Sequence, residues 1–111
     1  MEQRMRLLVY PVKDLAKAKT LYSELLGVEP YADAAYYVGF RIGDLEIGLD
    51  PHGRSGGPLA YWEVSDIKAS VRQLLDAGAQ PDQDVKDVGG GKLIATVKDA
   101  DCNMLGLMHS P

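Results

Sequence analysis

Residues 6–27, RLLVYPVKDLAKAKTLYSELLG, decide the fold, because a similar arrangement returns at residues 58–78, PLAYWEVSDIKASVRQLLDAG. Each stretch begins with an apolar run typical of a strand, continues with Val-x-Asp-(Leu/Ile), and ends in an amphipathic pattern closed by glycine. Asp14 and Asp66 are placed to cap two helices, since an aspartate side chain accepts the free N–H groups of a first helical turn. These aspartates lie about half a chain apart, so the 111 residues are predicted to form two similar units.

Each predicted helix carries an apolar stripe that we expect to pack on a sheet. The stripe of the first helix consists of Leu15, Ala18, Leu21, Tyr22, Leu25 and Leu26. That of the second consists of Ile67, Val71, Leu74 and Leu75. Gly27 and Gly78 are expected to end the helices, because glycine adopts the left-handed conformation of a C-terminal cap without strain.

After the first helix the pattern alternates, as in a strand. Residues 36–50, YYVGFRIGDLEIGLD, predict a hairpin around Gly43-Asp44, with Gly39 opposite Gly48 and Arg41 opposite Glu46. The face expected to be apolar holds Tyr36, Val38, Phe40, Ile42, Leu45, Ile47 and Leu49. Residues 89–109 predict the matching strand pair of the second unit, so each unit is a βαβββ module. We place module one at 5–50, a linker at 51–57 and module two at 58–109, within a single domain 1–111.

Composition narrows the class of protein. With 46% hydrophobic and 25% charged residues the chain is typical of a globular domain. A net charge of −4 predicts no nucleic-acid or anionic membrane partner. The single cysteine, Cys102, allows neither an internal disulfide nor a multi-cysteine zinc site. The apolar run before Pro11 is too short for a signal peptide or a membrane span, and the expected location is the cytoplasm.

Two Val-x-Asp motifs and the sequence DADCN, residues 99–103, before the last predicted strand give the chain a family resemblance. It resembles the vicinal oxygen chelate superfamily, which includes glyoxalase I, extradiol dioxygenases, fosfomycin-modifying enzymes and bleomycin-resistance proteins. The resemblance implies an α+β fold. Two tandem βαβββ modules would form a cup-shaped, mostly antiparallel curved sheet with helices on the convex side and a metal or ligand on the concave side.

The resemblance also implies four metal-ligand positions, and this sequence departs from the family at each of them. They fall at Leu7, Gly48, Leu59 and Gly106, none of which has a donor side chain. A shift of two residues would place Glu46 at the second position. Because a catalytic metal needs about three protein ligands, we predict that the protein uses no metal and no cofactor.

Side chains on the face with the bare glycines are the candidate ligand contacts. They are Val9, Tyr37, Gly39, Arg41, Glu46, Gly48, Asp50, Tyr61, Glu63, Thr96, Met104, Gly106 and Met108. Aromatic and methionine side chains beside a few polar groups suit an amphipathic organic ligand. Two other interpretations stay open: the side chains fill the space themselves, and Arg41 with Glu46 is an ordinary surface pair. Trp62 is assigned to the core.

Together these features favour a metal-free binding protein of the bleomycin-resistance type, which sequesters a small organic compound and, as the resemblance implies, forms a homodimer. No catalytic residue is assigned. The alternative is an enzyme of the same superfamily. It would be a metal-free lyase or isomerase with Glu63 or Asp50 as base, or a lyase, isomerase or dioxygenase-like enzyme with non-canonical ligands such as Glu46 with His52.

Three further features receive structural interpretations. His52 is expected in the linker, and His109 is expected to point away from Gly106. Cys102 occupies a loop position where the family prefers glycine. The glycines at 89–91 precede a strand instead of a helix, so we expect a lid over the cavity and not a phosphate-binding loop.

Overall fold

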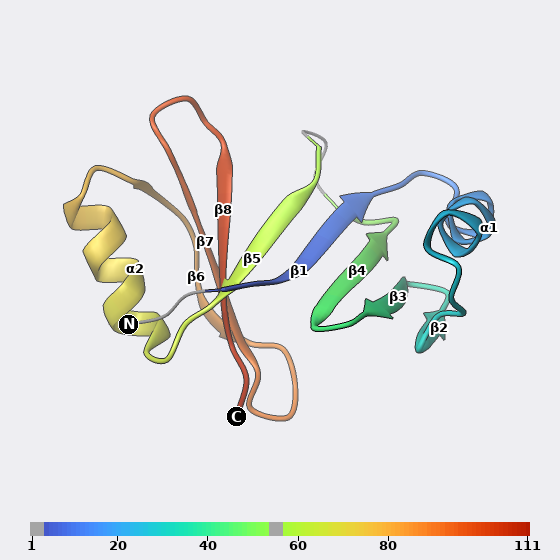
Figure 1. Cartoon of the computed structure of the whole chain (residues 1–111). Helices are drawn as coiled ribbons and strands as arrows, with labels where there is room; N and C mark the ends of the chain where they lie inside the picture. Colours follow the sequence, from blue (N-terminus) through green and yellow to red (C-terminus); the bar gives the residue numbers. More distant parts are fainter. Residues whose placement is uncertain (1–3, 54–56) are drawn as a thin grey trace. The chain divides into compact units, whose positions relative to one another are not determined.

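The computed structural model describes residues 4–53 and 57–111 (Figure 1). Residue contacts divide the chain into two compact units, one of residues 6–59 and one of residues 60–111 together with Arg4 and Met5. The middle of the predicted linker, residues 54–56, lies outside the described residues.

Module one contains one helix and four strands. Its elements are β1 (Arg4–Pro11), α1 (Leu15–Leu26), β2 (Ala32–Ala34), β3 (Tyr37–Ile42) and β4 (Leu45–Asp50). The strand order is β2-β3-β4-β1, in which β3 is antiparallel to both neighbours and β1 is parallel to β4.

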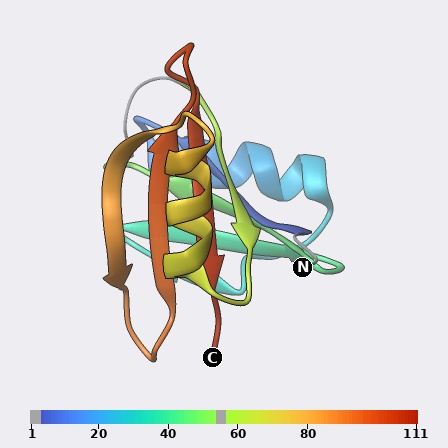
Figure 2. The ribbon, with the colours of Figure 1, turned by 90° about the vertical axis from the view of Figure 1, so that its left-hand side faces the viewer.

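Module two repeats this connectivity. Its elements are β5 (Leu59–Glu63), α2 (Ile67–Asp76), β6 (Gln80–Asp87), β7 (Leu93–Lys98) and β8 (Met104–His109). The strand order is β5-β8-β7-β6, with β5 parallel to β8 and the other pairs antiparallel. Figure 2 shows α2 in front of this sheet, where it contacts β6, β7 and β8. The predicted α+β class with two mostly antiparallel βαβββ modules is confirmed.

The strand register follows the prediction. Gly39 lies opposite Gly48, and Arg41 lies opposite Glu46 in the β3–β4 hairpin. The parallel pairs also correspond between modules, since Val9 of β1 is the partner of Gly48 and Tyr61 of β5 is the partner of Gly106. Gly48 and Gly106 are therefore equivalent positions of the repeat.

Three of the four helix caps are those that the sequence predicts. The Asp14 carboxylate accepts the backbone N–H of Lys17 at 3.0 Å, and the Asp66 carboxylate accepts that of Ala69 at 3.1 Å. Gly27 caps the end of α1 with a φ of 71°, in the left-handed region that glycine adopts at little cost. Helix α2 ends at Asp76 and its C-terminal cap is Ala77, one residue before the predicted Gly78.

The core of module one lies between α1 and one sheet face. Val38, Phe40, Ile47 and Leu49 are buried there, and Leu15, Ala18, Tyr22 and Leu26 of α1 pack against them. Two members of the predicted stripe, Leu21 and Leu25, are exposed, the latter by 72%. At about 100° per residue, Leu25 lies about 65° and Leu21 about 105° around the helix from the centre of the row that faces the sheet, and this sheet covers only that row. Tyr36, which we expected on the apolar face, precedes β3 and is 70% exposed.

The core of module two has the same plan. Val64, Ile67, Ala95 and Leu107 are buried, with Val71, Leu74, Val85 and Leu93 packed around them. Trp62 lies on the helix side of its strand, as its parity predicts, but 40% of it is exposed, so its assignment to the buried core is wrong. Within residues 4–53 and 57–111, no helix has both the length and the apolar character needed to cross a membrane.

Candidate functional site

The sheet face opposite the core of module one holds most of the predicted site residues of that module. Because strand side chains alternate, burial of Phe40 and Ile47 under α1 places Arg41 and Glu46 on the other face. We call this face, with Tyr37, Gly39, Arg41, Glu46 and Gly48, the polar face of module one.

The glycines of this polar face lie under tyrosine rings. A Cβ atom at Gly48 would lie 2.7 Å from Cζ of Tyr37, with the hydroxyl closer still. A Cβ atom at Gly39 would lie 2.8 Å from Cε2 of Tyr31. Both glycines therefore provide room for an aromatic side chain of the same module.

Gly106 in module two is constrained more strongly. A Cβ atom there would lie 2.6 Å from Cδ1 of Tyr61 and 2.7 Å from the carbonyl oxygen of Ala60. Glycine is needed because a ring and a neighbouring backbone approach closely. Gly48 and Gly106, two of the predicted ligand contacts, therefore leave no open space against the strands, because tyrosine rings fill it.

Three side chains on the polar face of module one contact one another. Arg41 Nε donates to Glu46 Oε1 at 3.3 Å, and the guanidinium carbon lies 4.2 Å from the centroid of the Tyr31 ring. Glu46 also interacts with the Tyr31 hydroxyl group, because it raises the pKa of Tyr31. The backbone N–H of Tyr31 donates to the Gly39 carbonyl at 2.9 Å, which holds its ring at the face.

Tyr31 was absent from the residues predicted for the site. It precedes the three-residue strand β2, where no alternation pattern assigns a side chain to a face. The hydrogen bond from its backbone N–H to the Gly39 carbonyl brings it to the polar face of module one. Burial raises the pKa of Tyr31 above its ordinary value, and Glu46 raises it further through its charge and its hydrogen bond, while Arg41 partly offsets the shift. Tyr31 therefore remains a hydrogen-bond donor well above neutral pH.

Asp50 and His52 have a local structural role. The Asp50 carboxylate accepts the backbone N–H of His52 at 2.8 Å, and the Asp50 carbonyl accepts that of Gly53 at 3.3 Å. These bonds close the turn after β4. These turn contacts do not test the predicted role of Asp50 in ligand binding, which stays a prediction.

In module two, Thr96 is buried and its hydroxyl group is already paired. It donates to Asp82 Oδ2 at 2.6 Å and accepts the backbone N–H of Gln83 at 3.2 Å. Lys98 lies 3.8 Å from the other oxygen of Asp82. These contacts lie at the register shift between β6 and β7, so Thr96 stabilises an irregular strand pair.

Glu63 is the most unusual carboxylate among the predicted residues. Its Oε1 accepts the backbone N–H of Ser110 at 3.0 Å. Its Oε2 is buried and has no hydrogen-bond partner among the residues that the structure describes. Glu63 is paired across the sheet with Met108, which is buried, while Met104 at the start of β8 is half-buried. A buried, unpaired carboxylate oxygen is costly and suggests a bound donor.

His109 and Cys102 have structural explanations. His109 Nδ1 donates to the Val64 carbonyl at 2.9 Å, on the helix side of module two. Cys102 is exposed and has a φ of 66°, which explains why glycine suits this position. Asp99 holds this loop by accepting N–H groups of Asp101 and Asn103, and the bonds from Asn103, above all, lower the Asp99 pKa.

The glycines at 89–91 form a tight connection between β6 and β7. The backbones of Val88 and Lys92 bond at 2.9 Å, and Lys92 N–H donates to the Gly89 carbonyl at 3.1 Å. All three glycines have positive φ values. Their role as a lid stays a prediction.

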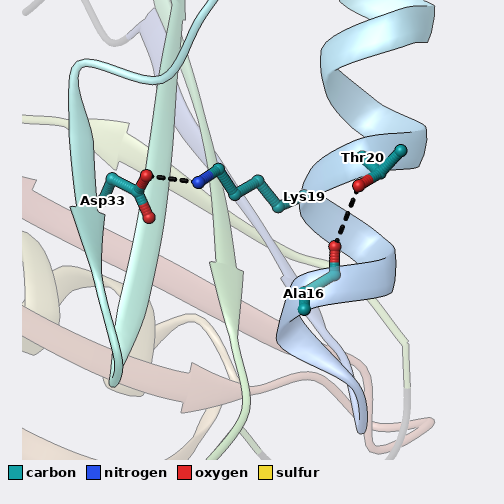
Figure 3. Close-up of polar contacts among 4 residues, drawn as sticks. All are labelled: Ala16, Lys19, Thr20 and Asp33. Carbon is teal, nitrogen blue, oxygen red and sulfur yellow. Dashed lines mark hydrogen bonds and ion pairs between the residues drawn. The ribbon is translucent and has the colours of Figure 1, made fainter.

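Two hollows lie beside the helices and involve none of the predicted site residues. One, of about 260 Å³, is lined by Trp62, Val64, Ser70, Gln73, Leu74, Leu105 and Leu107. The other, of about 380 Å³, is lined by Leu15, Ala16, Lys19, Asp33, Ala34, Ala35 and Val38. Figure 3 shows Lys19 of α1 reaching Asp33 of β2, while Thr20 donates to the Ala16 carbonyl at 3.2 Å. This ion pair joins α1 to the short strand β2.

The metal centre implied by the family does not fit these residues. Leu7 is buried and has no donor, and Gly48 and Gly106 lie under the rings of Tyr37 and Tyr61. Across residues 4–53 and 57–111, no group of three or more His, Cys, Asp or Glu side chains is arranged to hold a metal ion. We therefore derive no chemical step through a metal.

Fold and site together define a protein of two βαβββ modules whose polar sheet faces carry aromatic and charged side chains. The family model described as Glyoxalase/Bleomycin resistance protein/Dioxygenase superfamily matches residues 4–107, and the chain belongs to this family. No curated protein matches it by sequence.

Solved structures share the fold at low sequence identity. The hypothetical protein BH1468 from Bacillus halodurans C-125 aligns with a TM-score of 0.83 and 13% identity, over 100% of this chain and 96% of its own. A superfamily member from Vibrio splendidus 12B01 has a TM-score of 0.74 and 13% identity, over 98% and 100%. A methylmalonyl-CoA epimerase from Mycobacterium tuberculosis has a TM-score of 0.73 and 16% identity, over 96% and 88%.

Proposed function

We propose that this protein binds and sequesters a small amphipathic organic compound without a metal ion, in the manner of the bleomycin-resistance branch of its family. One observation carries the proposal. At two positions where the resemblance implies metal ligands, the chain has Gly48 and Gly106, each covered by a tyrosine ring. Aromatic rings next to charged groups favour an organic ligand, because they combine apolar contact with oriented hydrogen bonds. The proposed location is the cytoplasm.

The metal part of the proposal is tested by elemental analysis of the purified protein. We expect far less than one zinc, nickel, manganese or iron ion per chain. One tightly held ion per chain would contradict a metal-free function.

The binding part is tested by a thermal-shift screen of amphipathic compounds that includes bleomycin. A ligand at a hundredfold excess over its Kd stabilises the folded state by about 2.7 kcal/mol. We expect Tyr37→Ala to lose most of that stabilisation. Tyr36→Ala is the matched control, because Tyr36 is exposed and lies outside β3. Equal loss in both variants, or no stabilising compound, would count against binding at the polar face of module one.

A second candidate function is proton transfer by Glu63. The buried, unpaired Oε2 of Glu63 is the observation that favours it, and a similar fold occurs in methylmalonyl-CoA epimerases. A carboxylate base removes a proton from a carbon acid only if one oxygen is available to it. Incubation with methylmalonyl-CoA in deuterated water tests this candidate. Deuterium incorporation that is lost in Glu63→Gln and retained in Glu46→Gln would support it, and no incorporation by the unaltered protein would exclude this substrate.

A further inference from the structure

Arg41 is held in place by contacts that use only part of its hydrogen-bonding capacity. Its Nε donates to Glu46, and its guanidinium group stacks on Tyr31. Among the residues that the structure describes, the two terminal nitrogens of Arg41 have no hydrogen-bond partner. A guanidinium group has five N–H donors, so the pair of terminal nitrogens remains able to bind a planar anion through two parallel hydrogen bonds.

The exposed fractions of Arg41, Glu46 and Tyr31 fit a site that binds an anion from solvent. The Arg41 side chain is 64% exposed, whereas that of Glu46 is 16% exposed. The supporting carboxylate of Glu46 is therefore largely covered, while the guanidinium group and the Tyr31 ring, which is 45% exposed, both reach solvent. An ordinary surface pair lacks this support and contributes little to stability. Here Tyr31 is itself fixed by its backbone bond to Gly39 and by its ring contact over that glycine.

The charges define the kind of anion. Glu46 balances the charge of Arg41, and the whole chain has a net charge of −4, so long-range attraction of anions is weak. Binding must then depend on short-range geometry: two hydrogen bonds to a carboxylate and apolar contact with a tyrosine ring. A small inorganic anion makes only the first of these interactions.

From this arrangement we infer that Arg41, positioned by Tyr31 and Glu46, binds the carboxylate group of a small aromatic or similarly flat organic acid on the polar face of module one. This rests on the proposed function and narrows its ligand to the class of organic carboxylates. Tyr31 and Glu46 are positioning residues, because they act through the orientation of Arg41.

The test uses benzoate as the probe and benzamide as its uncharged equivalent of the same shape. The full chain, labelled with ¹⁵N, is titrated with each compound at millimolar concentration, and sodium chloride keeps the ionic strength constant. We expect benzoate to move the Arg41 Nε–H resonance and the Gly39 amide resonance, while benzamide moves neither. Equal shifts with both compounds would overturn the inference.

Substitutions distinguish the contribution of the Arg41 charge to binding from that of its orientation. Arg41→Gln should weaken benzoate binding at least about tenfold, and Arg41→Lys should weaken it severalfold because an ammonium group has no planar fork. Tyr31→Ala keeps the charge but removes the ring, and should also weaken binding severalfold. Arg72→Gln, at an exposed position on α2, is the matched control and should leave the affinity unchanged.

Each outcome decides between the inference and the proposed function. Benzoate affinity that is unchanged in Arg41→Gln overturns the inference, and so does an equal loss in Arg72→Gln. If neutral compounds bind the polar face of module one and carboxylates do not, the inference fails while the proposed function stands. If no organic compound binds the chain, both fail. The amide spectrum of each variant shows whether it is folded, and Tyr31→Ala decides the test if Arg41→Gln is not.

Discussion

Alanine at Gly106 should destabilise the protein more than alanine at the equivalent Gly48. The new Cβ atom at Gly106 would lie 2.7 Å from the Ala60 carbonyl oxygen, about 0.7 Å closer than ordinary contact at 3.4 Å. The strand backbone must shift, because the carbonyl group is fixed by the parallel pair β5–β8. At Gly48 the three nearest atoms all belong to the Tyr37 side chain, which is able to rotate away.

The expected magnitudes follow from these contacts. Overpacking against fixed neighbours costs about 1–3 kcal/mol, and alanine recovers roughly 0.5–1 kcal/mol relative to glycine in a strand. We expect Gly106→Ala to lose about 1–2 kcal/mol, or roughly 4–8 °C in melting temperature for a domain of this size. Gly48→Ala should lose less than about 1 kcal/mol.

Urea and thermal unfolding followed by circular dichroism provide the measurement. Gly106→Ala made in a Tyr61→Ala background checks the cause, because alanine lacks the Cγ and Cδ1 atoms of Tyr61 that the new Cβ atom would meet. Because the Ala60 carbonyl remains, removing the ring should restore little stability. Equal losses at Gly106 and Gly48, or full recovery in the double variant, would refute the assignment of the cost to the backbone contact.

Three further predictions concern other parts of the chain. Glu46→Gln should lower the pKa of Tyr31 toward about 10, as measured by NMR of labelled tyrosine, and an unchanged pKa would contradict the contact between the two side chains. Because the pKa of Tyr31 is raised in the folded state, the stability that this shift contributes is complete below about pH 10. It is lost as the pH rises through the Tyr31 pKa. Cys102→Gly should raise the free energy of unfolding by about 0–1 kcal/mol, whereas Cys102→Val should lower it by more than about 1 kcal/mol, because a branched side chain is strained at a φ of 66°. Similar melting temperatures of the two variants would argue against backbone strain at this position. Light scattering at micromolar concentration should give twice the single-chain mass of 12.1 kDa, because the family resemblance implies a homodimer and exposed sheet edges favour pairing. A mass of one chain would exclude a stable homodimer.

Local and periodic features of this protein were predictable from its sequence. The caps at Asp14 and Asp66 depend on contacts within a few residues, so their positions follow directly from the motif. The register that pairs Gly39 with Gly48 follows from a two-residue turn and strict alternation, because a slip by one residue would move the apolar side chains to the other face. The family resemblance followed from the same repeated pattern.

The tertiary structure alone decided what the glycines are for. A glycine in a strand shows that something approaches closely, but the sequence does not say whether that is a ligand, a ring or a backbone. The Tyr37 ring reaches Gly48 from β3, whereas the Tyr61 ring reaches Gly106 from β5, so no single spacing rule covers both. Tyr31 joins Arg41 through a backbone hydrogen bond to Gly39 of the nearby strand β3, which no periodic pattern of the sequence predicts. Periodicity assigns side chains to a face, but only the packed backbone determines which of them touch, because contacts between strands depend on the position of the whole chain.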